Sequence, residues 1–300
     1  MKKRFTHHSE YGHIESILIK RPEEGFISQS KINSEWEELR FLEPPDLDTS
    51  INEYRYFESV LTSTITEVHR LPQNSSVTLD SIYCRDATLI TDHGLILCRM
   101  GKKQRTLEPQ AIREYCLEKN ISILGEIEEP GTLEGGDVAW IDEQTLAVGH
   151  TYRTNYNGII QLKKLLTPWD IKVIVVDLPH YRGPSDVFHL MSVFSPIDRD
   201  LAVVYSPLMP IAFRNKLLDS NFYLIEVPEN EFESMGCNVL AISPRNCIIP
   251  QGNPKTVDLM LKAGCNVLTY PCNDISIKGG GGPTCLTRPM KRSMTDTGFN

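Results

Sequence analysis

Apolar and polar positions follow a repeated order along the chain. A short apolar strand, a polar loop, an amphipathic helix and a second apolar strand recur, and each helix carries apolar residues at three- and four-residue spacing. The amino-terminal part gives a loose copy, with a strand at 16–20, a long insertion and a helix near 54–68. Four further copies are predicted at 88–91 with 95–98, 109–119 and 121–124; at 145–149, 158–166 and 173–177; at 201–205, 210–218 and 222–227; and at 239–243, 256–263 and 266–270.

Units of this kind cannot bury their apolar faces separately, whereas stacking them around an axis covers every face. An open, doubly wound sheet would also explain the alternation of strands and helices. The extra hairpin in several units favours a closed ring instead. We therefore expect an α/β propeller of five pseudo-symmetric ββαβ-like units, formed by residues 1–300 as a single domain, whose loops converge on a central active site.

Composition narrows the classes of function. The 300 residues are 40% hydrophobic and 23% charged, which suits a chain with a packed core. The formal net charge is −8, from 31 basic and 39 acidic residues, so we expect no nucleic-acid partner. This charge suits a cationic small molecule, but it is also ordinary for a soluble protein. No apolar run approaches the ~20 residues of a membrane span, so we expect no membrane association.

Eight cysteines are present, and none are spaced as C-x-x-C. Neither a zinc ribbon nor a thioredoxin-like redox site is therefore indicated. The amino terminus lacks the apolar segment of a secretory signal. We expect reduced thiols and a cytoplasmic location.

Four consecutive glycines, 279–282, are followed by a Pro-Thr pair and then by Cys285. Glycines permit backbone conformations and close approaches that side chains forbid. A P-loop would end in Gly-Lys-Ser/Thr, where this chain has Gly-Pro-Thr-Cys, and no strand–GxGxxG–helix unit is present. The run instead suits a nucleophilic thiol that a substrate can approach closely, with an inert buried thiol as the alternative.

A thiol nucleophile usually needs a proton-transfer partner. His189 is the best candidate, because it lies in an apolar context that leads into a buried strand, whereas the other histidines lie in polar segments, in a loop or at element edges. The alternative is a hydrogen-bonded histidine of the core.

Carboxylates also stand beside apolar strands. Glu134 and Asp137 flank a Gly-Gly pair directly before one strand, and Asp86 stands at the start of another. Such groups are costly to bury unless they pair with a cation or with backbone donors. A bound cationic ligand would meet that need, and so would internal pairing with an arginine. The planar forks of Arg105 and Arg153 could in turn hold a carboxylate.

Together these segments resemble the guanidino-group-modifying superfamily with the pentein fold, which includes arginine deiminases, dimethylarginine dimethylaminohydrolases and amidinotransferases. The similarity extends from Tyr11-Gly12 and Lys20-Arg-Pro22 to Arg288-Pro289, and it implies the same fivefold propeller as the repeats. The matching pieces, in family order, are Arg85-Asp86, Arg105, Glu134-Gly-Gly-Asp137, Val148-Gly149 with Arg153-Thr-Asn155, His189-Leu190, Gly236-Cys-Asn238 and Gly280-Gly-Gly-Pro-Thr-Cys285.

The resemblance implies that Cys285 is the nucleophile and His189 the general acid and base, while Asp86 and Glu134 clamp the guanidinium nitrogens. Attack of the thiolate on the guanidinium carbon would give a covalent thiouronium, which water would convert to citrulline and an amine or ammonia. Because Glu134 would contact the reacting guanidinium, it is grouped with the catalytic residues. No metal or organic cofactor is required.

The resemblance also implies groups that hold the rest of the substrate. Arg105 and Arg153 would contact its carboxylate. Asp137 belongs to the candidate substrate-binding set, although support of the loop is the favoured role for it. The segment Gly236-Cys-Asn238 lines the site without an assigned step, and a homo-oligomer stays open.

One position departs from the pattern. Deiminases and amidinotransferases usually carry an acidic residue two positions after the histidine, where this chain has Met191. That favours the dimethylarginine dimethylaminohydrolase branch, whereas Arg85 before Asp86 resembles the deiminases more. An amidinotransferase, in which an amine replaces water, and a non-catalytic binding propeller are the alternative functions.

Overall fold

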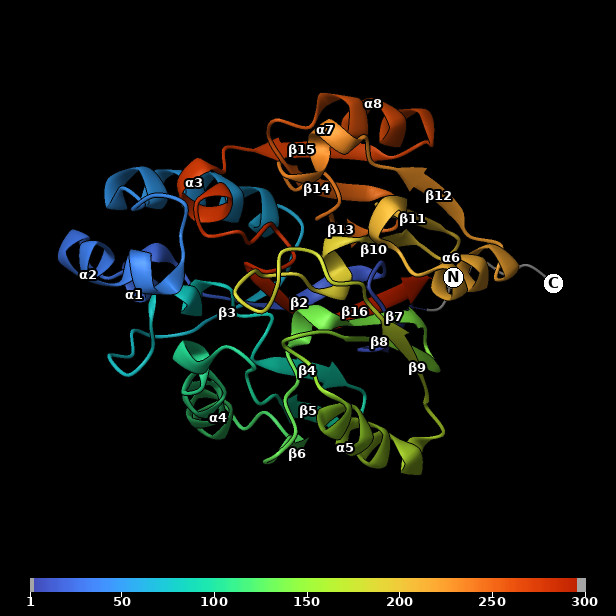
Figure 1. Cartoon of the computed structure of the whole chain (residues 1–300), viewed down its shortest axis with the longest axis horizontal. Coiled ribbons are helices and arrows are strands. Elements are labelled where there is room, and N and C mark those ends of the chain that lie inside the picture. The colour runs from blue at the N-terminus through green and yellow to red at the C-terminus, as the bar shows by residue number, and fades with distance from the viewer. Residues whose placement is uncertain (1–2, 296–300) are drawn as a thin grey trace.

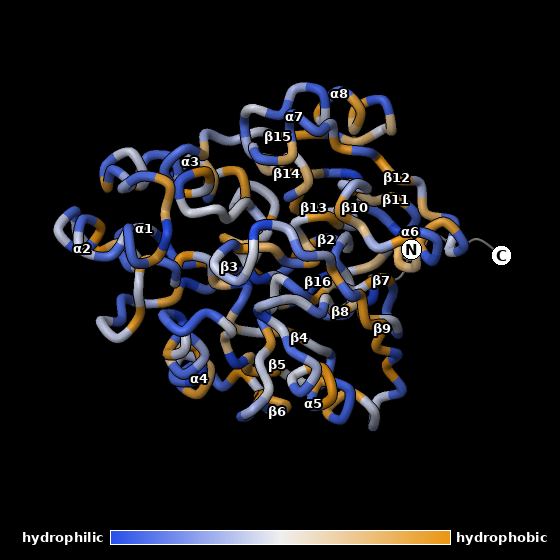
Figure 2. The backbone as a smooth tube through the Cα atoms, in the orientation of Figure 1, coloured by the Kyte–Doolittle hydropathy of each residue, from blue (hydrophilic) through white to orange (hydrophobic). Residues whose placement is uncertain are grey.

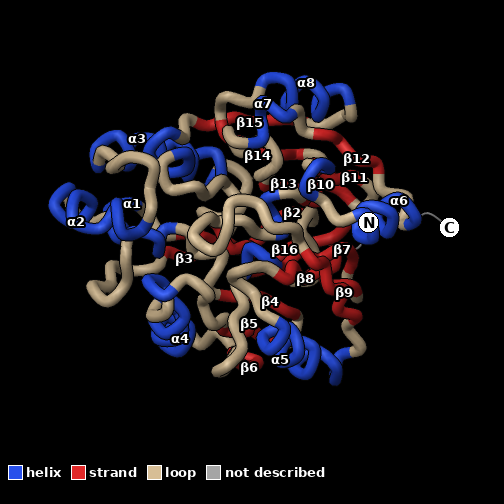
Figure 3. The backbone as a smooth tube through the Cα atoms, in the orientation of Figure 1, coloured by secondary structure: helices blue, strands red, loops and turns tan. Residues whose placement is uncertain are grey.

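Five small β-sheets surround the middle of the molecule in the computed structural model, which describes residues 3–295, and the helices lie at the periphery (Figures 1 and 3). Four sheets share one topology: an antiparallel hairpin, a helix, and a third strand parallel to the second. These units are β4 (Thr88–Thr91), β5 (Gly94–Leu97), α4 (Glu108–Glu118) and β6 (Ile123–Glu126); β7 (Val138–Asp142), β8 (Thr145–His150), α5 (Tyr156–Leu166) and β9 (Lys172–Asp177); β10 (Phe194–Asp198), β11 (Leu201–Val204), α6 (Ile211–Asp219) and β12 (Tyr223–Glu226); and β13 (Leu240–Ser243), β14 (Asn246–Pro250), α8 (Pro254–Lys262) and β15 (Asn266–Tyr270). The short helix α7 (Glu229–Phe232) connects the last two units.

The fifth sheet joins the two ends of the chain. β2 (His13–Ile19) pairs antiparallel with β16 (Thr287–Thr295) and parallel with β3 (Glu67–Arg70), and α3 (Leu47–Thr62) connects β2 to β3. β1 (Lys3–Thr6) adds a fourth strand beside β16. The unit β16–β2–α3–β3 thus repeats the ββαβ order of the other four, and the predicted five units are confirmed.

Helix α5 shows how a unit closes its core. Asn155 caps the helix by accepting a hydrogen bond from the Gly158 N–H at 2.9 Å. Ile159, Leu162 and Leu166 then lie on one helical face and pack in a buried cluster with Trp140 of β7. In Figure 2 the helices elsewhere in the chain also alternate between hydrophilic and hydrophobic residues along the backbone.

The predicted helix near 54–68 is wrong at both ends. Helix α3 begins after its cap Asp46, whose carboxylate accepts from the Thr49 N–H at 2.8 Å, and ends at Thr62. The apolar spacing continues past the end through Ile65 and Val68, but Val68 lies in β3. The long insertion contains α1 (Pro22–Gly25) and α2 (Gln29–Leu39). No described helix is both long and apolar enough to cross a bilayer.

Candidate active site

Five polar residues stand just before the first strands of the five units. Asp86 precedes β4, Glu134 precedes β7, His189 precedes β10, Asn238 precedes β13 and Cys285 precedes β16. Neighbouring units touch through these strands, since β10 contacts β13 and β16 contacts β4. The pseudo-symmetry of the fold therefore brings together residues that are up to 199 positions apart in the chain.

Two adjoining cavities mark the place where these segments meet. The larger, of about 200 Å³, is lined by His189, Cys285 and Asn238, and the smaller, of about 30 Å³, by Asp86. Cys285 and Arg153 line both. A separate cavity of about 220 Å³ has no histidine in its lining. Among these cavities of residues 3–295, only the pair has both a thiol and an imidazole in its lining.

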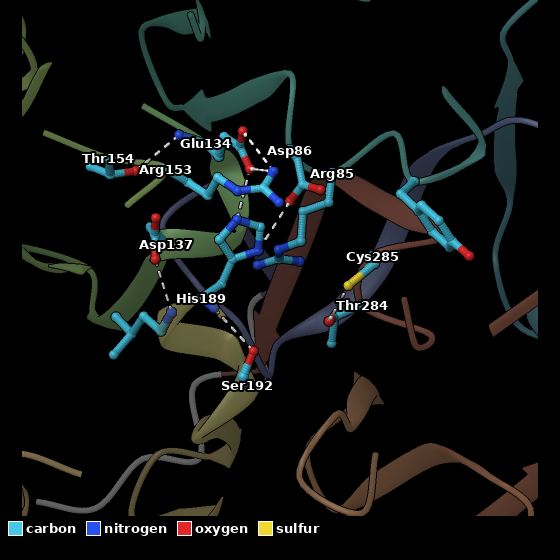
Figure 4. Close-up of polar contacts among 12 residues, drawn as sticks. Arg85, Asp86, Glu134, Asp137, Arg153, Thr154, His189, Ser192, Thr284 and Cys285 are labelled. Atoms are coloured by element: carbon cyan, nitrogen blue, oxygen red, sulfur yellow. Dashed lines mark hydrogen bonds and ion pairs between the residues drawn. The ribbon is translucent and has the colours of Figure 1, made fainter. Parts of the chain in front are cut away.

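His189 is held by carboxylates. Its Nε2 lies 2.8 Å from Oε2 of Glu134, and its Nδ1 lies 3.9 Å from Oδ1 of Asp86 (Figure 4). Burial disfavours the charged ring, but the carboxylates of Asp137, Asp86 and Glu134 outweigh burial and raise the pKa of His189 to about 9. The imidazole is therefore protonated at neutral pH.

Glu134 is completely buried, and both its oxygens have partners. Oε2 faces His189, while Oε1 accepts from the backbone N–H groups of Gly101 and Lys102 at 2.9 and 3.0 Å. Burial alone would raise the pKa of Glu134, but His189 and Arg153 lower it well below its usual range. Glu134 is not among the residues that line either cavity, so its carboxylate is directed at the histidine. This differs from the expected clamp on a guanidinium.

Asp86 keeps one oxygen free of hydrogen bonds within the protein. Oδ2 accepts from Nη1 of Arg105 at 2.6 Å, whereas the buried Oδ1 has no hydrogen-bond partner in the described part of the chain. A buried acceptor without a partner is costly, and a donor in the cavity would remove that cost. Asp86 is thus suited to receive a planar cation.

The two candidate arginines differ in how firmly they are held. Arg105 donates to both oxygens of Glu108 at 2.9 and 2.8 Å, as well as to Asp86. Arg153 makes only long contacts, 3.5 Å to Glu134 and 3.4 Å to the Asp186 carbonyl. Both line the smaller cavity. Arg153 is the one whose fork is left available, whereas Arg105 orients Asp86.

Asp137 supports the loop that carries the histidine. Its Oδ1 accepts from the Leu190 N–H at 3.0 Å and its Oδ2 from the Thr151 hydroxyl at 2.7 Å. Burial raises the pKa of Asp137 to about 6. The neighbouring Gly136 is required by packing, since a Cβ there would lie 2.4 Å from Nδ1 of His189. Asp137 thus has the loop-supporting position that the sequence favoured.

Cys285 is partly buried, and its thiol accepts a hydrogen bond from Nδ2 of Asn238 at 3.5 Å. Burial and the carboxylate of Asp86 raise the pKa of the thiol, against the opposing effect of Asn238. In the glycine run, Gly280 has a φ of +75°, and a Cβ on Gly282 would lie 2.5 Å from the Asn238 side chain. The glycines therefore permit the packing that positions the thiol.

Sequence reasoning missed two residues at this place. The buried Asp80 forms an ion pair with the partly buried Lys102 at the smaller cavity. Asp80 lies six residues before Asp86 within an apolar run, which is the signal that could have pointed to it.

Three side chains in the site have the types of ligand atom that a metal needs. Asp86, Glu134 and His189 offer atoms within 4.8 Å of one another. A metal there would have to displace the proton from His189, whose raised pKa opposes that exchange.

The comparisons with known proteins agree with this architecture. The protein is 27% identical over 286 residues to the uncharacterized protein YkgA of Bacillus subtilis, covering 95% of this chain and 94% of that one. It is 25% identical over 243 residues to the N(G),N(G)-dimethylarginine dimethylaminohydrolase of Pseudomonas aeruginosa, covering 81% and 89%. The structure of the dimethylarginine dimethylaminohydrolase of Pseudomonas aeruginosa in complex with citrulline superposes with a TM-score of 0.73 at 21% identity, over 94% of this chain and all of that one.

A match to a whole family extends over most of the chain. The sequence model described as N,N dimethylarginine dimethylhydrolase, eukaryotic, matches residues 39–292, which includes every candidate site residue. This result confirms the expected pentein superfamily and favours the branch that Met191 indicated. The chain belongs to the dimethylarginine dimethylaminohydrolase family of hydrolases.

Proposed function

We propose that the protein hydrolyses an N-methylated arginine to citrulline and a methylamine through a covalent thiouronium on Cys285. The observation that carries this proposal is that the Cys285 thiol, the protonated His189 and the unpartnered Oδ1 of Asp86 border the same paired cavities. A nucleophile, an acid and a receptor for a planar cation are thereby available together.

The substrate cation forms the first contact. Oδ1 of Asp86 accepts a guanidinium N–H in the smaller cavity. A guanidinium carbon is a poor electrophile, and fixing its plane beside a thiol places it for attack. The bound cation also lowers the pKa of Cys285, which burial and Asp86 raise in the free protein.

Covalent chemistry follows on Cys285. The thiolate adds to the guanidinium carbon, and the tetrahedral adduct expels the substituted nitrogen, which takes a proton from His189 and leaves as the amine. The neutral imidazole then removes a proton from water, and the resulting hydroxide attacks the thiouronium carbon. The second tetrahedral adduct then collapses: the carbon–sulfur bond breaks, and the proton of the adduct's hydroxyl group passes to the departing sulfur, replacing the proton that Cys285 lost before its attack. The ureido product and the thiol are thereby formed, and His189 carries the proton taken from water. Glu134 holds the imidazolium through the cycle.

Two further residues support the choice of substrate. Arg153, with its loosely held fork, binds the α-carboxylate. Met191 lines the larger cavity at the position where related enzymes carry a carboxylate. Its thioether packs more favourably against the N-methyl groups of a substrate than against a charged nitrogen that has no methyl group. Because all five units contribute to the site, we also infer that residues 1–300 act as one domain.

Steady-state assays test the proposal directly. The protein is given dimethylarginine, monomethylarginine, arginine and agmatine, and citrulline, methylamines and ammonia are quantified. We expect turnover of the methylated arginines that is lost in Cys285→Ala. Ammonia from arginine alone would indicate a deiminase, and turnover that requires an added amine would indicate an amidinotransferase. Either result would overturn the proposed substrate or reaction.

A further inference from the structure

The cavity of about 220 Å³ lies between two units of the fold and outside the active site. Lys20, directly after β2, and Leu71, directly after β3, line it from the unit that joins the chain ends, and Glu108 and Ile112 line it from α4 of the next unit. Arg105, which pairs with Glu108, lines the smaller active-site cavity instead. The two sites are therefore neighbours that share no lining residue through this ion pair.

Lys20 is a buried cation in the lining of this cavity. Its exposed fraction is 3%, and among residues 3–295 its ammonium group has neither a hydrogen-bond acceptor nor an ion-pair partner. Glu108 lines the same cavity, but both its oxygens accept from Arg105, at 2.9 and 2.8 Å. Burial lowers the pKa of Lys20, against the opposing effect of Glu108, because an ammonium group is costly to remove from water. Lys20 is thus a donor that lacks an acceptor within the described part of the protein.

The rest of the lining combines apolar walls with acidic groups at the opening. Leu71, Val77 and Ile112 are buried and supply apolar surface. Glu114 and Glu118 also line the cavity, but they are exposed, so they lie where it opens to solvent. The cavity therefore has a positive charge in its interior, an apolar middle and negative charges at its mouth.

We propose that this cavity binds a small α-amino acid with an apolar side chain, in its zwitterionic form. The carboxylate of the ligand accepts from Lys20, its side chain packs against the apolar walls, and its ammonium group faces Glu114 and Glu118. The acidic mouth disfavours a simple anion, and Lys20 disfavours a simple amine.

The size of the cavity fits such a ligand. A water molecule occupies about 30 Å³ in the liquid, so the cavity of about 220 Å³ suits a ligand of about seven to nine non-hydrogen atoms. Valine and leucine are in this range, whereas nucleotides and peptides exceed it. The interior charge, the mouth and the volume therefore all favour the same class of molecule.

Isothermal titration calorimetry with L-leucine tests the site. We expect saturable binding of one ligand per chain, with a Kd between about 10 μM and 1 mM. Isocaproate lacks the amino group of leucine and isoamylamine lacks its carboxylate, so each should bind at least about 10-fold more weakly. Absence of saturable leucine binding, or equal affinity for either analogue, would overturn the proposal.

Substitutions locate the binding. Lys20→Met removes the buried charge and should abolish leucine binding, whereas Lys163→Met, which alters an exposed lysine of α5, should retain it. Ala111→Phe places a ring in the cavity and gives the same test if Lys20→Met fails to fold. The double variant E114Q/E118Q should lose the preference for leucine over isocaproate, because the mouth no longer carries negative charge.

Binding of leucine at the active site is the alternative location. Arg153 lines only the active-site cavities of those compared, so Arg153→Ala should leave the Kd for leucine unchanged. Loss of leucine binding in Arg153→Ala, or an unchanged Kd in Ala111→Phe or in folded Lys20→Met, would contradict a site beside Lys20. These titrations need no turnover, so they are independent of the proposed reaction.

Discussion

Nε2 of His189 lies 2.8 Å from Oε2 of Glu134, and both side chains are buried. Related enzymes with an acidic residue two positions after the histidine can orient the ring from its own segment, but this chain has Met191 there. Glu134 performs that task from the neighbouring unit, with its other oxygen fixed by two backbone N–H groups. The protonated ring of His189 is therefore stabilised by a carboxylate from another unit of the fold and not by a residue of its own segment.

Glu134→Gln should lower kcat by about 10²-fold or more, because the neutral amide no longer stabilises the imidazolium. The alkaline limb of the kcat profile should shift to lower pH, since the pKa of His189 falls from about 9. The pH–rate profile of purified variants measures both effects. Glu58→Gln, which changes a carboxylate paired with Arg21 and Arg70, should leave the profile unchanged. A loss of kcat at unshifted pH would show that Glu134 does not act through His189.

Asp86→Asn should weaken substrate binding by about 2–4 kcal/mol, since a bound guanidinium would lose its charged partner in a buried site. Calorimetric titration of dimethylarginine into the Cys285→Ser variant, with and without the second substitution, measures this loss without turnover. Asp198→Asn, which alters a carboxylate paired with Arg245, serves as the matched control. Equal affinities with aspartate and asparagine at position 86 would remove Asp86 from the cation site.

Arg153→Ala should raise KM for methylated arginines by about 10–100-fold and leave KM for a methylated guanidine without a carboxylate nearly unchanged. Arg105→Lys should impair both substrates, because Arg105 orients Asp86. Comparing the two substrates across the two variants separates carboxylate binding from support of the cation site. A selective effect of Arg105→Lys on the carboxylate-bearing substrate would reverse these assignments.

Protein stability should decline as pH rises from about 6.5 through about 9. The folded-state pKa of His189 lies above its ordinary value, so its contribution is fully present below pH 6.5 and is lost as the folded imidazolium deprotonates. Urea unfolding at several pH values measures the free energy of the protein and of His189→Gln. Their difference should decrease across this interval by at most about 3 kcal/mol. A difference that is constant with pH would contradict a buried imidazolium.

The repeated pattern predicted the fold because each unit encodes its own amphipathic helix and short strands. The strand at 266–270 and the helix at 158–166 agree with β15 and with most of α5. The fifth unit was only partly visible, because its first strand is β16 at the opposite end of the chain. Pairing between chain ends is a tertiary event that leaves no local periodicity.

The types of site residue could be predicted, but the partner of each could not. Cys285 stood out because a run of four glycines precedes it, and His189 because it lies in an apolar segment that leads into a buried strand. Whether Glu134 faces a ligand or the histidine depends on the distance between two units, and the sequence does not contain that distance. The segment 236–238 was expected to line the site without an assigned step, and the structure adds the hydrogen bond from Asn238 to the Cys285 thiol.

The central claim is a covalent bond between Cys285 and the guanidino carbon. Acid quenching during turnover of dimethylarginine, followed by mass spectrometry of the intact and digested protein, detects that bond directly. The account predicts one added group with the mass of substrate minus dimethylamine, located on the peptide that contains Cys285 and absent from Cys285→Ala. Turnover without any adduct under conditions that slow the second step, or an adduct on one of the other seven cysteines, would contradict it.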